Sequence, residues 1–551
     1  MKQRSIRPGQ IALLLAISLV HVAAWFAYYG DLPAGQYPTQ AARAYLSAAQ
    51  AAADSQTGTE NPAAGDSLYT YVLSIFARFS DAEGGLVAAA RSLNALAFLW
   101  ITGVCASAAC RYWQSNRAVW IAGLLVGLNP VLVFWAGEIT PALLAAACMS
   151  SAVALLLPWF KETKISSSLI IAVFLTLAAS LQTVLLPFAL VWPIFAWLYP
   201  TQKKMPHLGV SGLPPVVLFA LIILTNLSLQ TSWQWELGPF SREAYSAYLA
   251  LTNQEASQGK SYALYRELHF ILLFNPIHWG ALFILAAFAF YARFKENPWS
   301  PSVLVAIAIL VLFALSFALN DGGSQSRVSL IPLVAIFAAG AYQLPRIWHR
   351  SNNSRRLKFI WAGLLLAVLS YAPQLITGPA KQWENDYAHL ARANLAMDQN
   401  QRATNWAEKA LELDPGRRDM QAVLVTAQFN NWAMGSQPKT LPIETAREYL
   451  AATKPVRERS TLRSIRAIYQ YKLRNAESAL ATWQADKESC PLALLCLYWT
   501  GTVQPTNFGK LDVYSERPYY HLLVEALSVD RNALGYTDLE KQIDNLLALA
   551  Y

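Results

Sequence analysis

The chain has 551 residues, of which 55% are hydrophobic and only 14% are charged. Soluble globular proteins carry charge on about a quarter of their residues. The composition therefore excludes an ordinary soluble protein and indicates an integral membrane protein. The net charge of +9 does not indicate nucleic-acid binding, because the basic residues cluster in short loops between apolar runs.

The chain begins with a basic segment, followed by an apolar run from Ile11 to Tyr28. A secretory signal peptide begins in the same way, but this run is long and has no clean small-residue cleavage site. We therefore expect a retained first span. Further apolar runs of sufficient length predict about eleven membrane helices in all. These runs lie near Leu86–Ala109, Val119–Trp135, Ala142–Phe160, Ile165–Ala179, Val184–Tyr199, Leu213–Leu229, Trp279–Phe294, Val303–Leu319, Val328–Gln343 and Phe359–Leu375.

The connections between the predicted spans alternate in charge. One set is short and basic, as at Arg111 and Arg117, and the other is acidic or mixed and includes the long loops 31–83 and 230–278. Cytoplasmic loops carry an excess of Lys and Arg, so the amino terminus is predicted to be cytoplasmic. An odd number of spans then places both long loops and the tail outside the cytoplasm, although the span count is least certain around Gln182.

The composition changes after Ile376, where Gly378 and Pro379 end the last apolar run. Residues 1–376 are therefore predicted to form the membrane domain, and residues 377–551 a soluble α-helical domain. The beginning of this tail matches the pattern of a tetratricopeptide repeat, a helix–turn–helix unit of about 34 residues. We expect an all-α, solenoid-like tail, although the later copies are degenerate. The pattern is formed by Tyr387, Leu390, Ala391, Ala403, Ala407, Ala410 and Pro415.

The sequence holds no sign of a metal or cofactor site. Histidines, cysteines and carboxylates do not occur at ligand spacing, and there is no glycine pattern for a nucleotide. We therefore expect neither a metal nor a cofactor. Cys490 and Cys496 lie in a run that predicts one helix, which would hold their sulfurs too far apart for a disulfide.

Several short motifs occur in order at matching positions of the predicted topology. They give the amino-terminal half, from about His21 to Gln343, a resemblance to the GT-C superfamily of polyprenyl-phosphate-sugar-dependent glycosyltransferases. The protein mannosyltransferase and aminoarabinose transferase branch (glycosyltransferase family 39-like) is the most similar, in the bacterial form with tetratricopeptide repeats behind the membrane domain. The motifs are Asp31, Tyr37 with Ala41-Ala42, Asp66-Ser-Leu-Tyr69, Ala90-Arg-Ser-Leu-Asn94, Gly127-Leu-Asn-Pro130, Gly137-Glu-Ile139 and Arg327-Val-Ser-Leu-Ile-Pro332.

The resemblance implies catalytic roles for two carboxylates. Asp31, directly after the first span, would be the general base that accepts the acceptor's proton. Glu138 would orient the acceptor or tune Asp31. The residues alone also allow structural readings, in which Asp31 ends a helix at the membrane surface and Glu138 occupies the first turn of the next helix, where the dipole favours a negative charge.

Two arginines are candidates for binding the lipid phosphate. A charge inside a span costs about 2.5–3.5 kcal/mol on insertion scales, so intramembrane arginines are functional candidates. Arg91 and Arg327 both lie near the outer ends of predicted spans, where an interfacial anchor is the alternative, especially for Arg327.

The first long loop carries three further candidates for the acceptor site, Tyr37, Asp66 and Tyr69. The family usually has a proline directly before the Leu-Tyr pair, and this chain has Ser67 there. That departure affects the expected conformation of the loop.

The sequence thus predicts an inverting glycosyltransferase of the bacterial inner membrane, with a periplasmic carboxyl-terminal domain. It would move a sugar from a polyprenyl-phosphate carrier in the bilayer to a protein or glycan acceptor bound with help from the tail. Two alternatives stay open. One is an oligosaccharide ligase of the O-antigen or pilin type, which the early long loop disfavours. The other is a non-catalytic membrane scaffold of a cell-envelope or secretion complex.

Overall fold

The computed structural model describes most of residues 1–376 and parts of the tail. The described residues are 7–54, 68–79, 83–159, 164–198, 209–217, 262–269, 279–296, 327–350, 353–377, 383–433 and 476–486, with isolated positions between them. All regular structure in these ranges is helical, which confirms the predicted all-α class. The chain divides into two compact units, Met1–Asp386 and Tyr387–Tyr551.

Within the described residues, two helices are long and apolar enough to cross a membrane. They are α1 (Pro8–Gly30) and the Gly84–Trp113 part of α5 (Glu83–Trp113). A third candidate is the bent pair α6 (Asn116–Gly127) and α7 (Pro130–Ala136), whose axes differ by 49°. These helices support the prediction that the chain contains membrane-spanning helices. The predicted number of eleven spans stays a prediction.

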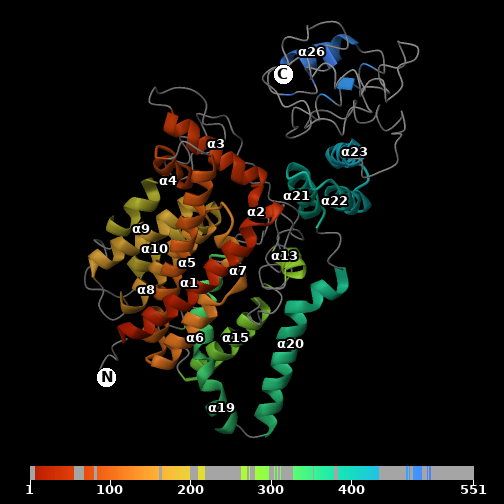
Figure 1. The fold of residues 1–551 in the computed structure, drawn as a ribbon. Coiled ribbons are helices and arrows are strands. Elements are labelled where there is room, and N and C mark those ends of the chain that lie inside the picture. Colours follow the sequence, from red (N-terminus) through yellow and green to blue (C-terminus); the bar gives the residue numbers. More distant parts are fainter. Residues whose placement is uncertain are drawn as a thin grey trace. The chain divides into compact units, whose positions relative to one another are not determined.

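The other predicted spans coincide in part with described helices of the first unit (Figure 1). Those near 142–160, 165–179, 184–199 and 279–294 form shorter apolar helices, while most of 213–229 and 303–319 lies outside the described residues. The remaining elements of this unit are α2 (Pro33–Gln36), α3 (Gln40–Asp54), α4 (Leu68–Ala77), α8 (Ala142–Trp159), α9 (Ile165–Leu181), η1 (Thr183–Leu185), α10 (Leu186–Leu198), α13 (Tyr262–Leu268), α15 (Trp279–Glu296), α18 (Ile331–Ala338), η2 (Ala339–Gln343), α19 (Leu344–Arg350) and α20 (Asn353–Thr377).

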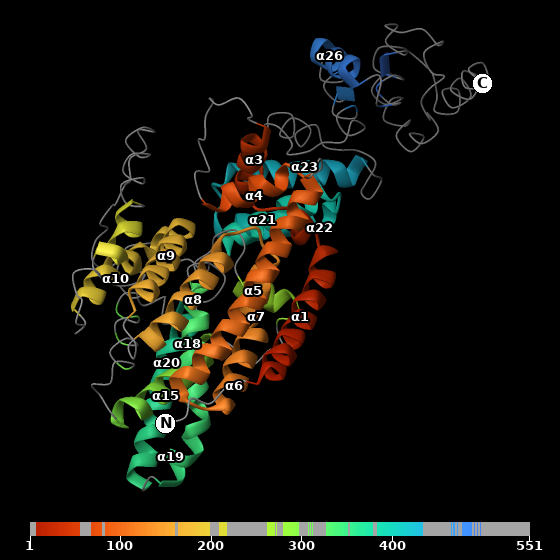
Figure 2. The same cartoon turned by 90° about the vertical axis from the view of Figure 1, so that its left-hand side faces the viewer.

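The first helix lies at the edge of the bundle and packs against both α5 and the bent pair (Figure 2). Near its beginning, Leu14 forms a buried cluster with Cys110 of α5 and Val119 of α6. Near its end, the Tyr29 ring lies 5.9 Å from the guanidinium carbon of Arg91 in α5. Helix α1 is therefore antiparallel to α5, and it runs in the same direction as α6 and α7.

The bend between α6 and α7 has a local cause. The Asn129 side chain caps α7 by accepting hydrogen bonds from the backbone N–H groups of Val131 and Leu132, at 3.0 and 3.2 Å. Pro130 occupies the first turn of α7, where its missing N–H costs nothing. These two residues start a new helix and direct its end, Gly137, towards the end of α1.

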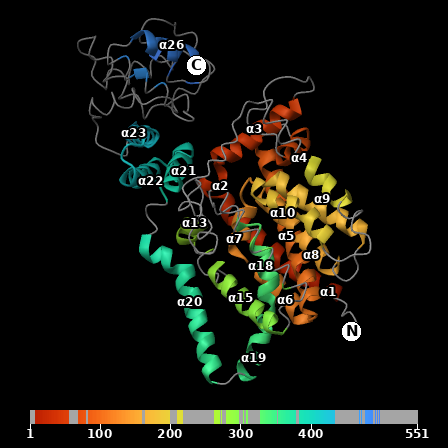
Figure 3. The same ribbon diagram turned by 180° about the vertical axis from the view of Figure 1, so that it is seen from behind.

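Helix α20 covers the predicted last span and packs against α15 (Figure 3). A Cβ atom on Gly363 would lie 3.2 Å from the Phe288 ring, so a small residue allows the close approach. The predicted domain boundary at residues 376–377 falls at the end of this helix, inside the first compact unit.

The described part of the tail contains α21 (Glu384–Ala396), α22 (Asn400–Leu413), α23 (Arg418–Ala433) and α26 (Ala476–Asp486). Four alanines of the repeat pattern, at positions 391, 403, 407 and 410, are fully buried in one core. The small side chains therefore allow α21, α22 and α23 to pack closely. A complete tetratricopeptide domain stays a prediction, because the degenerate copy at Glu444–Ala452 lies outside the described residues.

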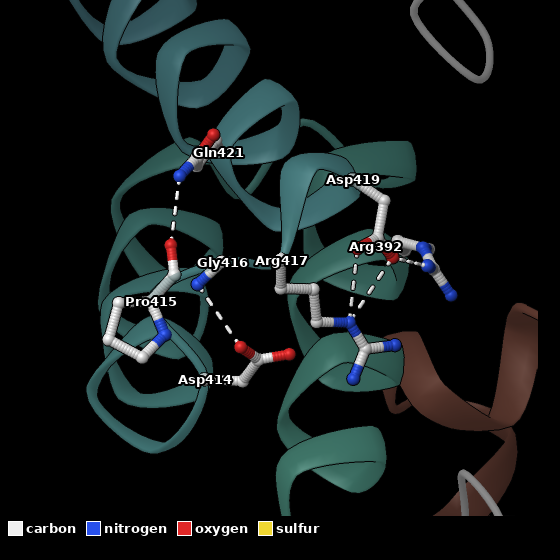
Figure 4. A network of polar contacts seen from close by, with 7 residues as sticks. All are labelled: Arg392, Asp414, Pro415, Gly416, Arg417, Asp419 and Gln421. Atoms are coloured by element: carbon white, nitrogen blue, oxygen red, sulfur yellow. Dashed lines mark hydrogen bonds and ion pairs between the residues drawn. The ribbon is translucent and has the colours of Figure 1, made fainter.

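The turn between α22 and α23 is held by polar contacts, which Figure 4 shows. Asp414 accepts a hydrogen bond from the Gly416 N–H at 3.1 Å, and Pro415 precedes that glycine. Asp419 of α23 binds Arg417 at 3.0 Å and also Arg392 of α21. Partial burial opposes ionisation, but the hydrogen bonds and charges of Arg417 and Arg392 lower the pKa of Asp419 below its usual range.

Candidate functional site

Buried and half-buried polar side chains from distant parts of the first unit meet where α1 and α7 end. We call them the Glu138 cluster, and they comprise Tyr29 of α1, Arg91 and Asn94 of α5, and Glu138 directly after α7. An ionisable group in the protein interior is costly unless it is hydrogen-bonded. The partners of each group therefore decide what this cluster can do.

Glu138 is only 5% exposed. Its carboxylate accepts a hydrogen bond from the Tyr29 hydroxyl, and its backbone carbonyl accepts one from the Asn94 side-chain amide at 2.6 Å. Both contacts fix the position of the loop that follows α7. The carboxylate is thereby oriented by a phenol from α1, which makes Glu138 a positioning group within this arrangement.

Arg91 joins two loops. Its Nε donates to the Gly137 carbonyl at 2.9 Å, and a terminal nitrogen donates to the Gly35 carbonyl. The guanidinium also lies near the face of the Tyr29 ring. The planar fork of arginine can bind two acceptors at once, so Arg91 holds the segment after α1 against the segment after α7.

Two glycines allow these loops to come so close. A Cβ atom on Gly35 would lie 1.9 Å from the backbone oxygen of Tyr29, and one on Gly137 would lie 2.8 Å from Nε1 of Trp25. Any larger residue at either position would push the loop away from α1. Glycine at these two positions therefore allows the loops that contact Arg91 to pack closely against α1.

Asp31 lies just beyond the cluster. It forms the carboxyl-terminal cap of α1, two residues after Tyr29, and its side chain is exposed. Glu138 and Arg91 are thus brought together by the fold, and the exposed Asp31 adjoins them through the chain. An exposed carboxylate is accessible to a substrate in a way that the enclosed Glu138 is not.

Three other predicted site residues belong to the first long loop. Tyr37 is 8% exposed, and the guanidinium of Arg43 lies 4.8 Å from its ring. Tyr69 is fully buried in α4, with its ring edge-on to Tyr45 at 5.3 Å. Asp66 lies outside the described residues. The Tyr69 side chain also lies close enough to interact with Asn94 of the Glu138 cluster, whereas Tyr37 packs against Arg43.

Arg327 is 3% exposed and lies just before α18. Two residues later, the Ser329 hydroxyl donates to the side-chain oxygen of Gln182 at 2.8 Å. Gln182 caps the carboxyl end of α9. The predicted outer connections at Gln182 and before Val328 are therefore adjacent in the fold.

Sequence reasoning missed a second contact at the end of α1. The Tyr28 hydroxyl lies 3.0 Å from Nδ1 of His269, and the His269 ring packs against Trp25 and Tyr265 at 6.4 and 5.7 Å. Burial lowers the pKa of His269 to about 4. The only signal in the sequence was the amphipathic pattern of 262–274, which does not specify the helix that this segment meets.

The segment that carries His269 also reaches the cluster. Burial, and then the negative charge of Glu138, raises the pKa of Tyr265 well above its usual range. The Tyr265 ring lies 6.5 Å from that of Tyr29 and 5.3 Å from that of Phe134. Helix α13 therefore covers one side of the Glu138 cluster with aromatic rings.

An apolar hollow lies among α8, α9 and α10, with a cavity volume of about 70 Å³. It could hold part of a hydrocarbon chain and offers no polar group to orient a ligand. Its lining includes Met149, Val153, Leu175, Phe188, Val191 and Trp192.

Within the described ranges, no group of three His, Cys, Asp or Glu side chains could hold a metal ion. No protein-family model matches this chain, and no curated protein matches it significantly.

Proposed function

We propose that this protein is a membrane glycosyltransferase that takes a sugar from a polyprenyl-phosphate carrier and transfers it to an extracytoplasmic acceptor. One observation carries the proposal. The half-buried Arg91 and the buried Glu138 lie at the same end of the helices as the exposed carboxylate of Asp31, with Arg91 bonded to the carbonyl of Gly137, the residue before Glu138. Ionisable groups among membrane helices are expensive, which makes them candidates for function.

The contacts favour different roles for the two carboxylates. Asp31 is exposed and is the better general base, because a base must reach the acceptor's proton. Glu138 is held by Tyr29 and fixes the end of α1. Arg91 binds two backbone carbonyls and positions the loops, which leaves Arg327 as the candidate for the lipid phosphate.

The apolar hollow supports a lipid-linked donor. A polyprenyl chain needs an apolar path among the membrane helices, and the hollow is lined by residues such as Phe188 and Trp192. The donor's phosphate would leave with its lipid, stabilised by a cation. Direct displacement by the acceptor would invert the anomeric centre.

The test uses purified full-length protein in proteoliposomes that contain radiolabelled polyprenyl-phosphate sugars. Asp31→Asn should abolish transfer, and Arg327→Gln should weaken it, while Arg117→Gln at the exposed start of α6 should have no effect. Transfer by Asp31→Asn at the unmodified rate would disprove the role of Asp31. Repeating the assay with pyrophosphate-linked donors distinguishes the ligase alternative, which requires them.

One observation favours the scaffold alternative. The described polar groups of the cluster bind one another or the backbone, as Arg91 does with Gly35 and Gly137, so the cluster is a stable structural element without substrate. A comparison of lipids and glycans in cells with and without the gene separates the two functions. A scaffold would leave both unchanged, whereas a transferase would alter a glycan or its lipid-linked precursor.

A further inference from the structure

Helix α4 is apolar on both faces. Its inner row, Leu73 and Ala77, is at most 5% exposed and continues the buried Tyr69. Its outer row is Tyr71, Ile75 and Phe79, which are 65%, 44% and 86% exposed. Each row has a spacing of four residues, so the two rows occupy different faces of the helix and its terminal turn.

The inner row fixes α4 to the membrane helices. The helix contacts α3, α5 and α9, and α5 is one of the two candidate spans. Both of its larger neighbours expose apolar side chains of their own, such as Trp100 of α5 at 58% and Ile170 of α9 at 45%. Side chains of this kind on a spanning helix face lipid. Helix α4 therefore packs beside the exposed apolar surface of a candidate membrane span.

The outer row has the composition of a membrane interface. Tyrosine and phenylalanine are typical of helices at the boundary between headgroups and acyl chains, and the exposed Arg78 beside them is suited to lipid phosphates. The helix has 10 residues, which is about half the length needed to span a bilayer. A contiguous exposed apolar row of this kind marks an interaction surface.

We propose that α4 is an interfacial helix whose outer row, Tyr71, Ile75 and Phe79, inserts into the adjoining lipid leaflet. The occupant of this surface is the bilayer itself. Its inner face meanwhile packs on α5, the helix that provides Arg91 and Asn94. Lipid contact on one face of α4 thus supports the Glu138 cluster from the other. The inference depends on membrane embedding and is independent of the proposed glycosyl transfer.

The test is photo-crosslinking in nanodiscs of phosphatidylethanolamine and phosphatidylglycerol, with full-length protein. Benzoylphenylalanine replaces Tyr71 or Phe79, two aromatic residues whose exposure leaves room for the larger side chain. The positive control is Leu19, which is 52% exposed on the spanning helix α1, and the negative control is the exposed Ser47 of α3. Each variant is first required to match the unmodified protein in size-exclusion profile and thermal midpoint.

Mass spectrometry of the irradiated protein reads out the partner. We expect lipid adducts at positions 71 and 79 with a yield within about twofold of position 19, and at least tenfold above position 47. Adducts to another protein segment or a second copy would overturn the inference, and so would a yield at 71 and 79 no higher than at 47. Loss of sugar transfer is not measured in this experiment, so its outcome is separate from that of the proposed function.

Discussion

At the scale of single residues, Arg91 connects two loops at the end of the bundle. It donates to two carbonyls on different loops, and each hydrogen bond to a charged group contributes about 1.5–3 kcal/mol. We predict that Arg91→Gln lowers the thermal midpoint strongly. Arg91→Lys should recover only part of the loss, because one ammonium group cannot reproduce the fork.

The matched control is Arg117→Gln, since Arg117 is exposed at the start of α6. The measurement is heat-induced unfolding in detergent, followed by intrinsic fluorescence. A thermal midpoint for Arg91→Gln equal to that of Arg117→Gln would show that the two carbonyl contacts contribute nothing to stability.

The contact between Tyr29 and Glu138 permits a second test on single residues. Tyr29→Phe removes the hydroxyl and leaves the buried carboxylate without that donor, which costs about 1–3 kcal/mol or more. Glu138→Gln removes the charge instead. We expect the double variant to be less destabilised than the sum of the two single ones, because the two groups interact directly.

Tyr28→Phe is the control for Tyr29→Phe. It removes a hydroxyl from the neighbouring tyrosine, whose hydrogen bond is to His269 and not to Glu138. The free energies come from a double-mutant cycle of thermal or chemical unfolding. Strict additivity of Tyr29→Phe and Glu138→Gln would contradict the hydrogen bond.

The chemistry of these residues was predictable, but their partners were not. Glu138 and Arg91 stand out in the sequence because charge is rare in apolar runs. Tyr29 lies 109 residues before Glu138 and Gly35 lies 56 residues before Arg91, and nothing local specifies contacts over such separations. The exposure of Asp31 was likewise decided by the fold.

At the scale of elements, the short helix α2 depends on glycine. A Cβ atom on Gly35 would lie 1.9 Å from the backbone oxygen of Tyr29, whereas one on Gly30 would meet nothing within 4 Å. We predict that Gly35→Ala reduces the yield of monodisperse protein and lowers its thermal midpoint. Gly30→Ala, five positions away on the same connection, should be neutral. Equal behaviour of the two variants would contradict the close approach of α2 to α1.

The packing of α13 on α1 should depend on pH through His269. Its pKa is lowered from 6.5 to about 4 in the folded protein. Between these values the unfolded state binds more protons than the folded one, so stability falls as the pH decreases from about 6.5 to 4. Above pH 6.5 His269 is neutral in both the folded and the unfolded protein, and its contribution to stability is fully present. Below about pH 4 it is protonated in both states.

The measurement is the thermal midpoint between pH 7.5 and 4.5, for the unmodified protein and for His269→Gln. We expect the decrease on acidification to be smaller in the variant, because glutamine has no ionising group. An identical pH profile of the two proteins would exclude His269 as the titrating group.

Hydropathy predicted where many helices lie but not how they bend. The apolar run from Val119 to Trp135 reads as one span, and the structure divides it at Asn129 and Pro130 into α6 and α7. The dipeptide itself is a recognised turn signal, but a hydropathy window averages it away. Hydropathy also did not predict helix α4 as a separate element. This helix is short, so a hydropathy window averages it with the polar residues on either side.

At the scale of the whole molecule, the helix order agrees with simple up-and-down packing in the part of the chain that is described. Helix α1 runs antiparallel to α5 and in the same direction as α6 and α7, as successive membrane spans must. The outer connections predicted from charge also gather in the fold, with Ser329 bonded to Gln182 and Tyr28 to His269. The side of the membrane on which these connections lie stays a prediction.

That sidedness can be tested with two reporters, because alkaline phosphatase is active only outside the cytoplasm and a fluorescent protein of the ordinary type is bright only inside it. Cytoplasmic loops are rich in Lys and Arg, and Gln114 lies in the turn between Arg111 and Arg117. Each reporter is fused in turn at each position. After Gln114, we predict that the fluorescent protein is bright and that alkaline phosphatase is inactive. Chains fused after Ala433, at the end of α23, should show the opposite.

The two fusions together test the parity of the spans between them. If the helices from α6 to α20 cross the membrane an odd number of times, the reporters must differ, whatever the exact count. Fluorescence from both fusions would place the tail in the cytoplasm, on the opposite side from the predicted position of Asp31 and Glu138. If instead the Gln114 fusion had phosphatase activity and the Ala433 fusion fluoresced, the protein would have the reverse of the predicted membrane orientation. The lipid-linked donor would then have to be bound from the cytoplasmic leaflet.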